Sequence, residues 1–152
     1  MILLGLIPII WKIKMYLIDT NVISELRKSS RANQGVIAFF NQAKRQQQAI
    51  YVSSITIGEL RRGIEVLRHR QDTVQAMQLE QWLSHIIEQF QSYILTFDPV
   101  ASQIWGRLRV PHAENAIDKQ IAAVALQHQL IMVTRNIKDF EHCGLALLNP
   151  FN

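Results

Sequence analysis

The chain has 152 residues, 49% of them hydrophobic, which favours one domain with its own core and excludes a largely disordered chain. Its single cysteine, Cys143, excludes a disulfide framework within the chain and is typical of the reducing cytoplasm. The formal charge of +4, from 16 Lys and Arg against 12 Asp and Glu, is compatible with a polyanionic partner such as nucleic acid.

Residues 1–14 form an apolar extension rich in Ile and Leu. The run is too short to span a bilayer, and it has no preceding basic residue and no small-residue cleavage site, so a secretory signal is poorly supported. We expect Met15 to be the natural start and the extension to be an artefact of an assigned start codon. An apolar arm that packs on a partner is the alternative, and a membrane anchor is the least favoured interpretation.

Strand-like and helical patterns alternate after Met15. Helical patterns over 57–67 and 74–90 follow one another without a strand, which predicts a projecting helical hairpin with its turn at 68–72. The alternation elsewhere predicts an α/β fold in which helices flank a central parallel sheet of about five strands. The predicted strands are 15–18, 49–53, 93–97, 130–133 and 145–148.

Four polar residues occur where a predicted strand ends or a helix begins: Asp19, Glu59, Asp118 and Asn136. In a parallel α/β sheet these places meet along one edge. Three carboxylates gathered there cannot all be ionised without cost unless a cation lies between them, and oxygen ligands suit Mg²⁺ or Mn²⁺. The pattern therefore predicts a metal-dependent enzyme of phosphoryl transfer.

Helix capping is an alternative explanation for each of these residues. Asp19 and Asn136 are suitable N-caps, and Asp118 has the position of a first-turn acid that the helix dipole favours. The segment from Thr56 to Glu59 fits a capping box. Asp118, however, lies beside the apolar face of its helix and has no arginine three or four residues later, so a partly buried carboxylate there needs another partner.

Four segments, 17–25, 57–63, 118–125 and 133–136, resemble in order and separation the motifs of the PIN-domain nucleases. Within that family the chain is most similar to the VapC toxins of bacterial toxin–antitoxin pairs, in their FitB-like branch. The resemblance extends from residue 15 to about residue 151. It implies a PIN domain over residues 15–152, with a three-layer PIN-like fold, and the activity of a metal-dependent endoribonuclease.

The resemblance also implies roles for individual residues. Asp19, Glu59 and Asp118 match the acids that hold Mg²⁺ or Mn²⁺. Asn136 falls where many relatives have a fourth acid, usually aspartate, and Glu25 matches another acid, to which we give a secondary role or none. The implied partners are an RNA substrate, a second copy in a homodimer and a small antitoxin protein, with promoter DNA bound only through the antitoxin complex and no membrane.

Two other functions are compatible with the same residues. A catalytically weak PIN module would act mainly by binding its antitoxin and promoter DNA. A metal phosphatase for small substrates would not need a basic surface. Trp82 and Trp105 lie on apolar helix faces, which favours core packing over base stacking. Candidate phosphate contacts are Arg27, Lys28, Arg31, Arg61, Arg62, Arg107, Arg109, Arg135 and Lys138.

Overall fold

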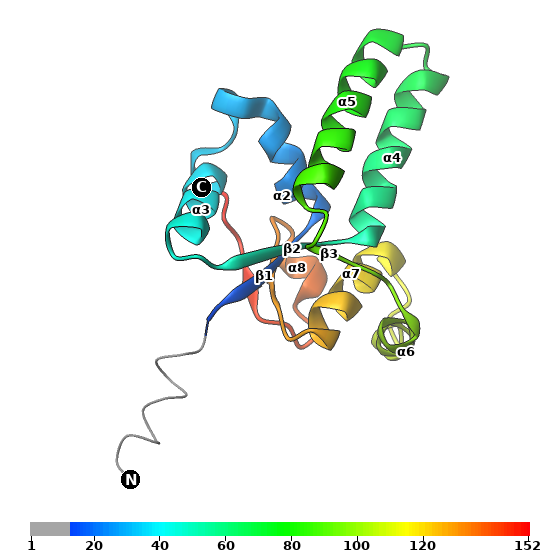
Figure 1. The fold of residues 1–152 in the computed structure, drawn as a ribbon. Helices are drawn as coiled ribbons and strands as arrows, with labels where there is room; N and C mark the ends of the chain where they lie inside the picture. Colours follow the sequence, from blue (N-terminus) through cyan, green and yellow to red (C-terminus); the bar gives the residue numbers. More distant parts are fainter. Residues whose placement is uncertain (1–12) are drawn as a thin grey trace.

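A computed structural model describes residues 13–152, and its centre is a five-stranded parallel sheet (Figure 1). The strand order is β3-β2-β1-β4-β5, so β1 lies in the middle with β2 and β4 on either side. This confirms the predicted α/β fold. The predicted apolar extension over residues 1–14 lies almost wholly outside the described residues and stays a prediction. The strands are β1 Met15–Ile18, β2 Ala49–Ser53, β3 Ile94–Leu95, β4 Ile131–Val133 and β5 Leu147–Leu148.

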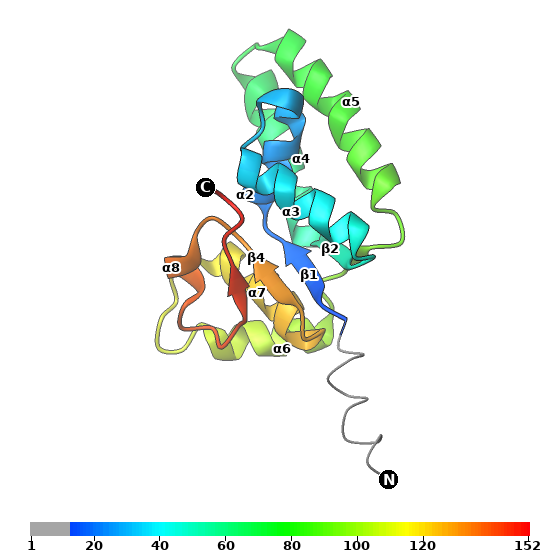
Figure 2. The same ribbon diagram turned by 90° about the vertical axis from the view of Figure 1, so that its left-hand side faces the viewer.

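Helices cover both faces of this sheet (Figures 1 and 2). None of the helices described is long and apolar enough to cross a membrane. The helices are α2 Thr20–Glu25, the 3₁₀ helix η2 Leu26–Arg31, α3 Gln34–Arg45, α4 Ser54–His69, α5 Thr73–Gln89, α6 Pro99–Leu108, α7 Ala116–Gln127 and α8 Ile137–Phe140.

The alternation of side chains along the strands decides which helices pack on each face. Leu17 and Met132 point to one face, where they join a fully buried cluster with α7 residues such as Val124. Ile18 and Val133 point to the other face, where α2 and α3 pack. Burial on both faces explains why the central strands are almost continuously apolar.

The two edge strands are shorter than predicted. The predicted strand 93–97 forms β3 only at Ile94–Leu95, and the predicted strand 145–148 forms β5 only at Leu147–Leu148. Each pairs with one neighbour, β2 or β4. A strand with a partner on one side only has fewer hydrogen bonds to hold its ends, so apolar pattern alone overestimates its length.

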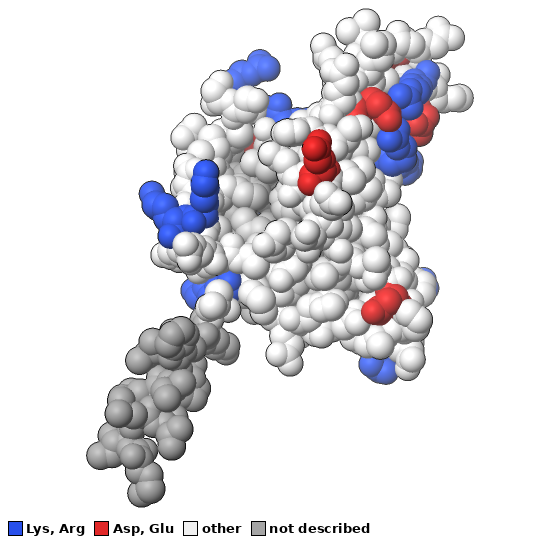
Figure 3. Space-filling view, in the orientation of Figure 1, with Lys and Arg blue, Asp and Glu red and all other residues white. Residues whose placement is uncertain are grey.

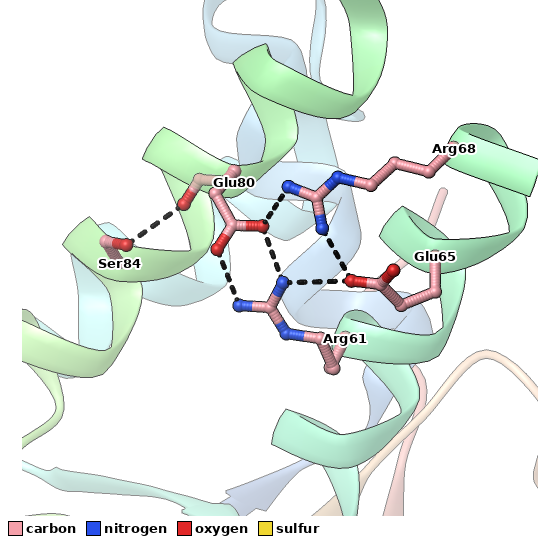
Figure 4. Close-up of polar contacts among 5 residues, drawn as sticks. All are labelled: Arg61, Glu65, Arg68, Glu80 and Ser84. Carbon is pink, nitrogen blue, oxygen red and sulfur yellow. Dashed lines mark hydrogen bonds and ion pairs between the residues drawn. The ribbon is translucent and has the colours of Figure 1, made fainter. Parts of the chain in front are cut away.

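Helices α4 and α5 form the predicted hairpin, which projects from the sheet (Figure 1). Ile64, Ala76 and Leu83 form a small buried core between them. On the exposed side, Glu80 of α5 pairs with Arg61 and Arg68 of α4 (Figure 4), and these guanidinium groups lower the Glu80 pKa to about 2.

The outer face of the hairpin therefore carries interspersed charges of both signs, as the space-filling view shows (Figure 3). Arg61 was predicted as a candidate phosphate contact. The structure instead places its guanidinium 2.8 Å from a carboxylate oxygen of Glu80, so Arg61 holds the two helices together.

Candidate functional site

Asp19 lies at the carboxyl end of β1, the central strand, and its side chain is almost fully buried. Its carboxylate accepts three hydrogen bonds: from the Thr20 amide at 2.8 Å, from Asn21 Nδ2 at 3.1 Å and from Thr134 Oγ1 at 2.8 Å. Asp19 is the N-cap of α2, as the capping alternative predicted. Capping uses only one of its two oxygens, so the cap does not account for the whole arrangement.

Thr134 and Asn21 fix the position of Asp19 from the neighbouring strand and helix. The Thr134 hydroxyl, at the end of β4, donates to Asp19 and accepts from the Asn136 amide at 3.1 Å. The Asn21 carbonyl oxygen accepts from the Arg135 amide at 3.1 Å. The sequence analysis assigned no role to Thr134, whose only signal is a hydroxyl directly after an apolar strand.

Glu59 lies in the second turn of α4, close to Asp19. The hydroxyl of Thr20 is 2.9 Å from Glu59 Oε1 and 3.2 Å from Thr56 Oγ1. The capping-box interpretation is wrong, because the N-cap of α4 is Ser53, which accepts from the Ile55 amide at 3.1 Å. Glu59 is therefore too far into the helix to cap it, and it faces the end of β1 instead.

Asp118 lies in the first turn of α7 and is half-buried. No hydrogen bond to its carboxylate occurs within residues 13–152. Lys119, the next residue, is buried and donates to the backbone carbonyl of His112. Burial, together with the negative charges of Asp19 and Asp139, raises the pKa of Asp118 to about 6. Among residues 13–152, this carboxylate has no positively charged partner within salt-bridge distance.

Asn136 precedes α8, but its side chain makes no capping hydrogen bond, so the capping alternative is not supported here. The side chain is exposed beside Thr134. Asp139, one turn later, is close enough to raise the Asp118 pKa. The short helix α8 turns it back toward α7, a return that spacing does not reveal.

Glu25 has a structural explanation. Its carboxylate, nearly buried, accepts from the Asn33 amide at 2.8 Å and from Lys28 Nζ at 2.9 Å. The Lys28 ammonium and the Asn33 amide together lower the Glu25 pKa. The bond from Asn33 ties the end of α2 to the start of α3.

The electrostatics of the site favour a bound cation. Burial raises the pKa of Asp19, and the charge of Glu59 raises it as well, against the hydrogen bonds that lower it. Asp19 is thus coupled to Glu59 on one side and to Asp118 on the other. Within the described residues, no group of three or more Asp, Glu, His or Cys converges closely enough to hold one ion. The carboxylate donors suit Mg²⁺ or Mn²⁺ by type and charge, and their repulsion keeps them apart.

The charge of Asp118 is expected to destabilise the metal-free fold. Because its folded-state pKa of about 6 lies above the ordinary 3.8, the fold binds more protons than the unfolded chain between these values. The free energy of unfolding therefore falls as pH rises through this window and stays lower above it.

The substitution Asp118→Asn removes this dependence. Thermal melts in chelator should show a larger gain for the variant at about pH 8 than at about pH 4. Equal gains at both pH values would contradict the assignment.

The chain is similar to known proteins along most of its length. The PIN domain family matches residues 16–144. Toxin FitB of Neisseria gonorrhoeae is 34% identical over 144 residues, covering 91% of this chain and 99% of that protein. VapC ribonuclease Y4jK of Sinorhizobium fredii is 30% identical, covering 90% and 98%. A chain in the structure of FitAB bound to the IR36 DNA fragment superimposes with a TM-score of 0.71 at 32% identity, covering 91% and 96%.

Proposed function

This chain belongs to the PIN-domain family, and on that premise we propose that it is a metal-dependent endoribonuclease toxin that a cognate antitoxin neutralises. The observation that carries the proposal is the set of carboxylates around the end of β1, which repel one another and have no positive partner in the part of the chain that the structure describes. A relative of similar length is named a VapC ribonuclease, and another is named a toxin.

Asp19, Glu59 and Asp118 would hold Mg²⁺ or Mn²⁺. The bound ion would lower the pKa of a water and offset the charge of the scissile phosphate. The residues around it have separate tasks. Thr134 and Asn21 orient Asp19 through their hydrogen bonds, and Thr20 orients Glu59. These bonds fix the Asp19 and Glu59 side chains before substrate arrives.

The proposed partners follow from the relatives. Similar chains occur in FitAB and in a DNA-bound VapBC complex, which supports a small antitoxin partner and promoter DNA bound through the complex. We also propose a homodimer. The basic balance of the chain, with 16 Lys and Arg against 12 Asp and Glu, favours RNA over small phosphate esters as the substrate.

One observation favours a catalytically weak module instead: the described carboxylates do not converge on one ion. Expression in a host that lacks the antitoxin separates the two functions. A ribonuclease arrests growth and leaves broken cellular RNA, and both effects disappear in the Asp118→Asn variant and on co-expression of the cognate antitoxin. Growth arrest without RNA breakage, or arrest by the variant, would contradict the proposal.

Asn136, which falls where many relatives have a fourth acid, provides a test of metal binding. The exposed amide of Asn136 is a poorer ligand for a hard cation than a carboxylate, so a second ion should bind weakly to the free protein. We expect Asn136→Asp to tighten binding of Mn²⁺, and Asn136→Ala to reduce cleavage less than Asp19→Asn does. Isothermal titration with Mn²⁺ measures the first effect. Two tight sites in the unmodified protein, or unchanged affinity in Asn136→Asp, would refute this role.

A further inference from the structure

A cavity of about 270 Å³ lies between α2, α4 and α5, and Glu59 of the candidate site lines it. Thr20 and Glu59, which are hydrogen bonded at 2.9 Å, form part of its lining. Its volume is below the roughly 300–1,000 Å³ of sites for drug-sized ligands, which suits a single planar ring system. Its apolar lining consists of Leu60, Ile64, Leu67, Leu79 and Trp82.

Trp82 and three polar side chains give the cavity its chemical character. Trp82 is half-buried, packs into the core at the base of the hairpin and still lines the cavity, so it offers a ring surface for stacking. Ser24, Arg27 and Gln75 also line it. The Gln75 amide can donate and accept, and the Arg27 guanidinium can donate two parallel hydrogen bonds.

A basic groove of about 330 Å³ continues from this cavity toward η2. The two share Arg27, Gln75, Leu79 and Trp82. The charged residues that line the groove are all cations: Arg27, Lys28 and Arg31.

Two of these three cations are available for a ligand. Lys28 is paired with Glu25 at 2.9 Å. No acid within residues 13–152 lies within salt-bridge distance of Arg27 or Arg31. A groove lined by unpaired guanidinium groups complements a phosphate backbone, whereas a peptide partner would require acidic side chains at the same places.

We propose that the cavity binds one nucleobase of the RNA, with guanine preferred, and that the basic groove follows the adjoining backbone. The inference rests on the proposed ribonuclease function and assigns its sequence preference. Guanine is favoured because its O6 and N7 are neighbouring acceptors that match the two donors of Arg27, while the Gln75 carbonyl can accept from the Watson–Crick edge. Trp82 supplies the stacking surface, and Arg31 contacts the backbone.

The test measures binding without cleavage. Single-stranded RNA hexamers that differ in one central base are titrated in Mg²⁺ against full-length Asp118→Asn protein, with fluorescence anisotropy as the readout. We expect the guanine hexamer to bind about tenfold more tightly than the uracil or cytosine hexamer. Adding Arg27→Ala should remove this preference, and Trp82→Leu, which keeps an apolar side chain in the core, should weaken binding of every hexamer. Arg45→Ala, at an exposed arginine at the end of α3, is the charge-matched control and should change nothing.

Several results would overturn the proposal. The first is equal affinity for the hexamers with each of the four central bases. The second is a guanine preference that persists in the Arg27→Ala variant. The third is that Arg27→Ala and Trp82→Leu lose their co-purifying antitoxin while RNA binding is unchanged, which would assign the cavity to the antitoxin. Cleavage by the unmodified protein is scored separately. If the protein cleaves all sequences alike, the ribonuclease function is supported and the guanine-binding cavity is contradicted. If the protein prefers guanine in binding but cleaves no RNA, the cavity is supported and the ribonuclease function is contradicted.

Discussion

Replacement of Asp118 by asparagine is expected to lower RNA cleavage about a thousandfold or more while the protein stays folded, since a metal ion contributes several kcal/mol to such reactions and each tenfold corresponds to about 1.4 kcal/mol. The carboxylate receives no hydrogen bond within the described residues, so an amide of the same shape disrupts nothing. Steady-state cleavage of a labelled RNA in Mg²⁺, with a thermal melt of each protein, measures both effects.

Asp19→Asn should lower cleavage to a similar extent, with a different effect on stability. Three donors converge on the Asp19 carboxylate. An asparagine at this position would point its own N–H groups at some of these donors. Such a mismatch costs about 1–3 kcal/mol, which offsets the gain from removing a buried charge. Cleavage by either variant at close to the unmodified rate would show that the residue does not hold the metal.

Glu59→Gln is the second prediction with a large effect, and it separates catalysis from capping. Because Ser53 caps α4, we expect the variant to lose most of its cleavage activity and to change in stability by less than the roughly 1 kcal/mol of a lost cap. The glutamine carbonyl can still accept from Thr20, so the local structure is retained. Denaturant unfolding and cleavage per folded molecule are the two measurements.

The matched control for Glu59→Gln is Glu65→Gln, on the exposed face of the same helix. It removes an equal charge at a residue that pairs only with Arg61 and Arg68, and it should leave cleavage unchanged. If Glu59→Gln lowers stability by about 1 kcal/mol and retains its activity per folded molecule, Glu59 is a structural residue of α4.

The main features of the fold were predictable because they depend on local pattern. Apolar runs such as 15–18 and 131–133 are buried on both faces, which identifies central parallel strands. The acids at the ends of these elements, Asp19 and Asp118, were predicted to meet because parallel strands share a carboxyl edge. The coupling of their charges agrees with that expectation.

Features that depend on tertiary packing were not predictable from spacing. Helix α4 begins at Ser54, directly after β2 ends, and not after Thr56. Glu59 therefore lies in the second turn of α4 and belongs to the candidate site, not to the helix cap. Thr134 and Asp139 joined the site only through the pairing of β4 with β1 and the turn into α8. Trp82 was correctly predicted to pack in the core, but the cavity beside it arises from the approach of α2 to the hairpin.

Metal-dependent cleavage by the purified full-length protein, free of antitoxin, tests the central claim most directly. A labelled single-stranded RNA is incubated with the unmodified protein and with Asp118→Asn, in Mg²⁺, in Mn²⁺ and in chelator, and the product ends are identified. We predict cleavage that requires the metal and Asp118 and that leaves linear phosphate ends, because water is the nucleophile. Cleavage that persists in chelator or in the variant, or products ending in 2′,3′-cyclic phosphate, would contradict the account.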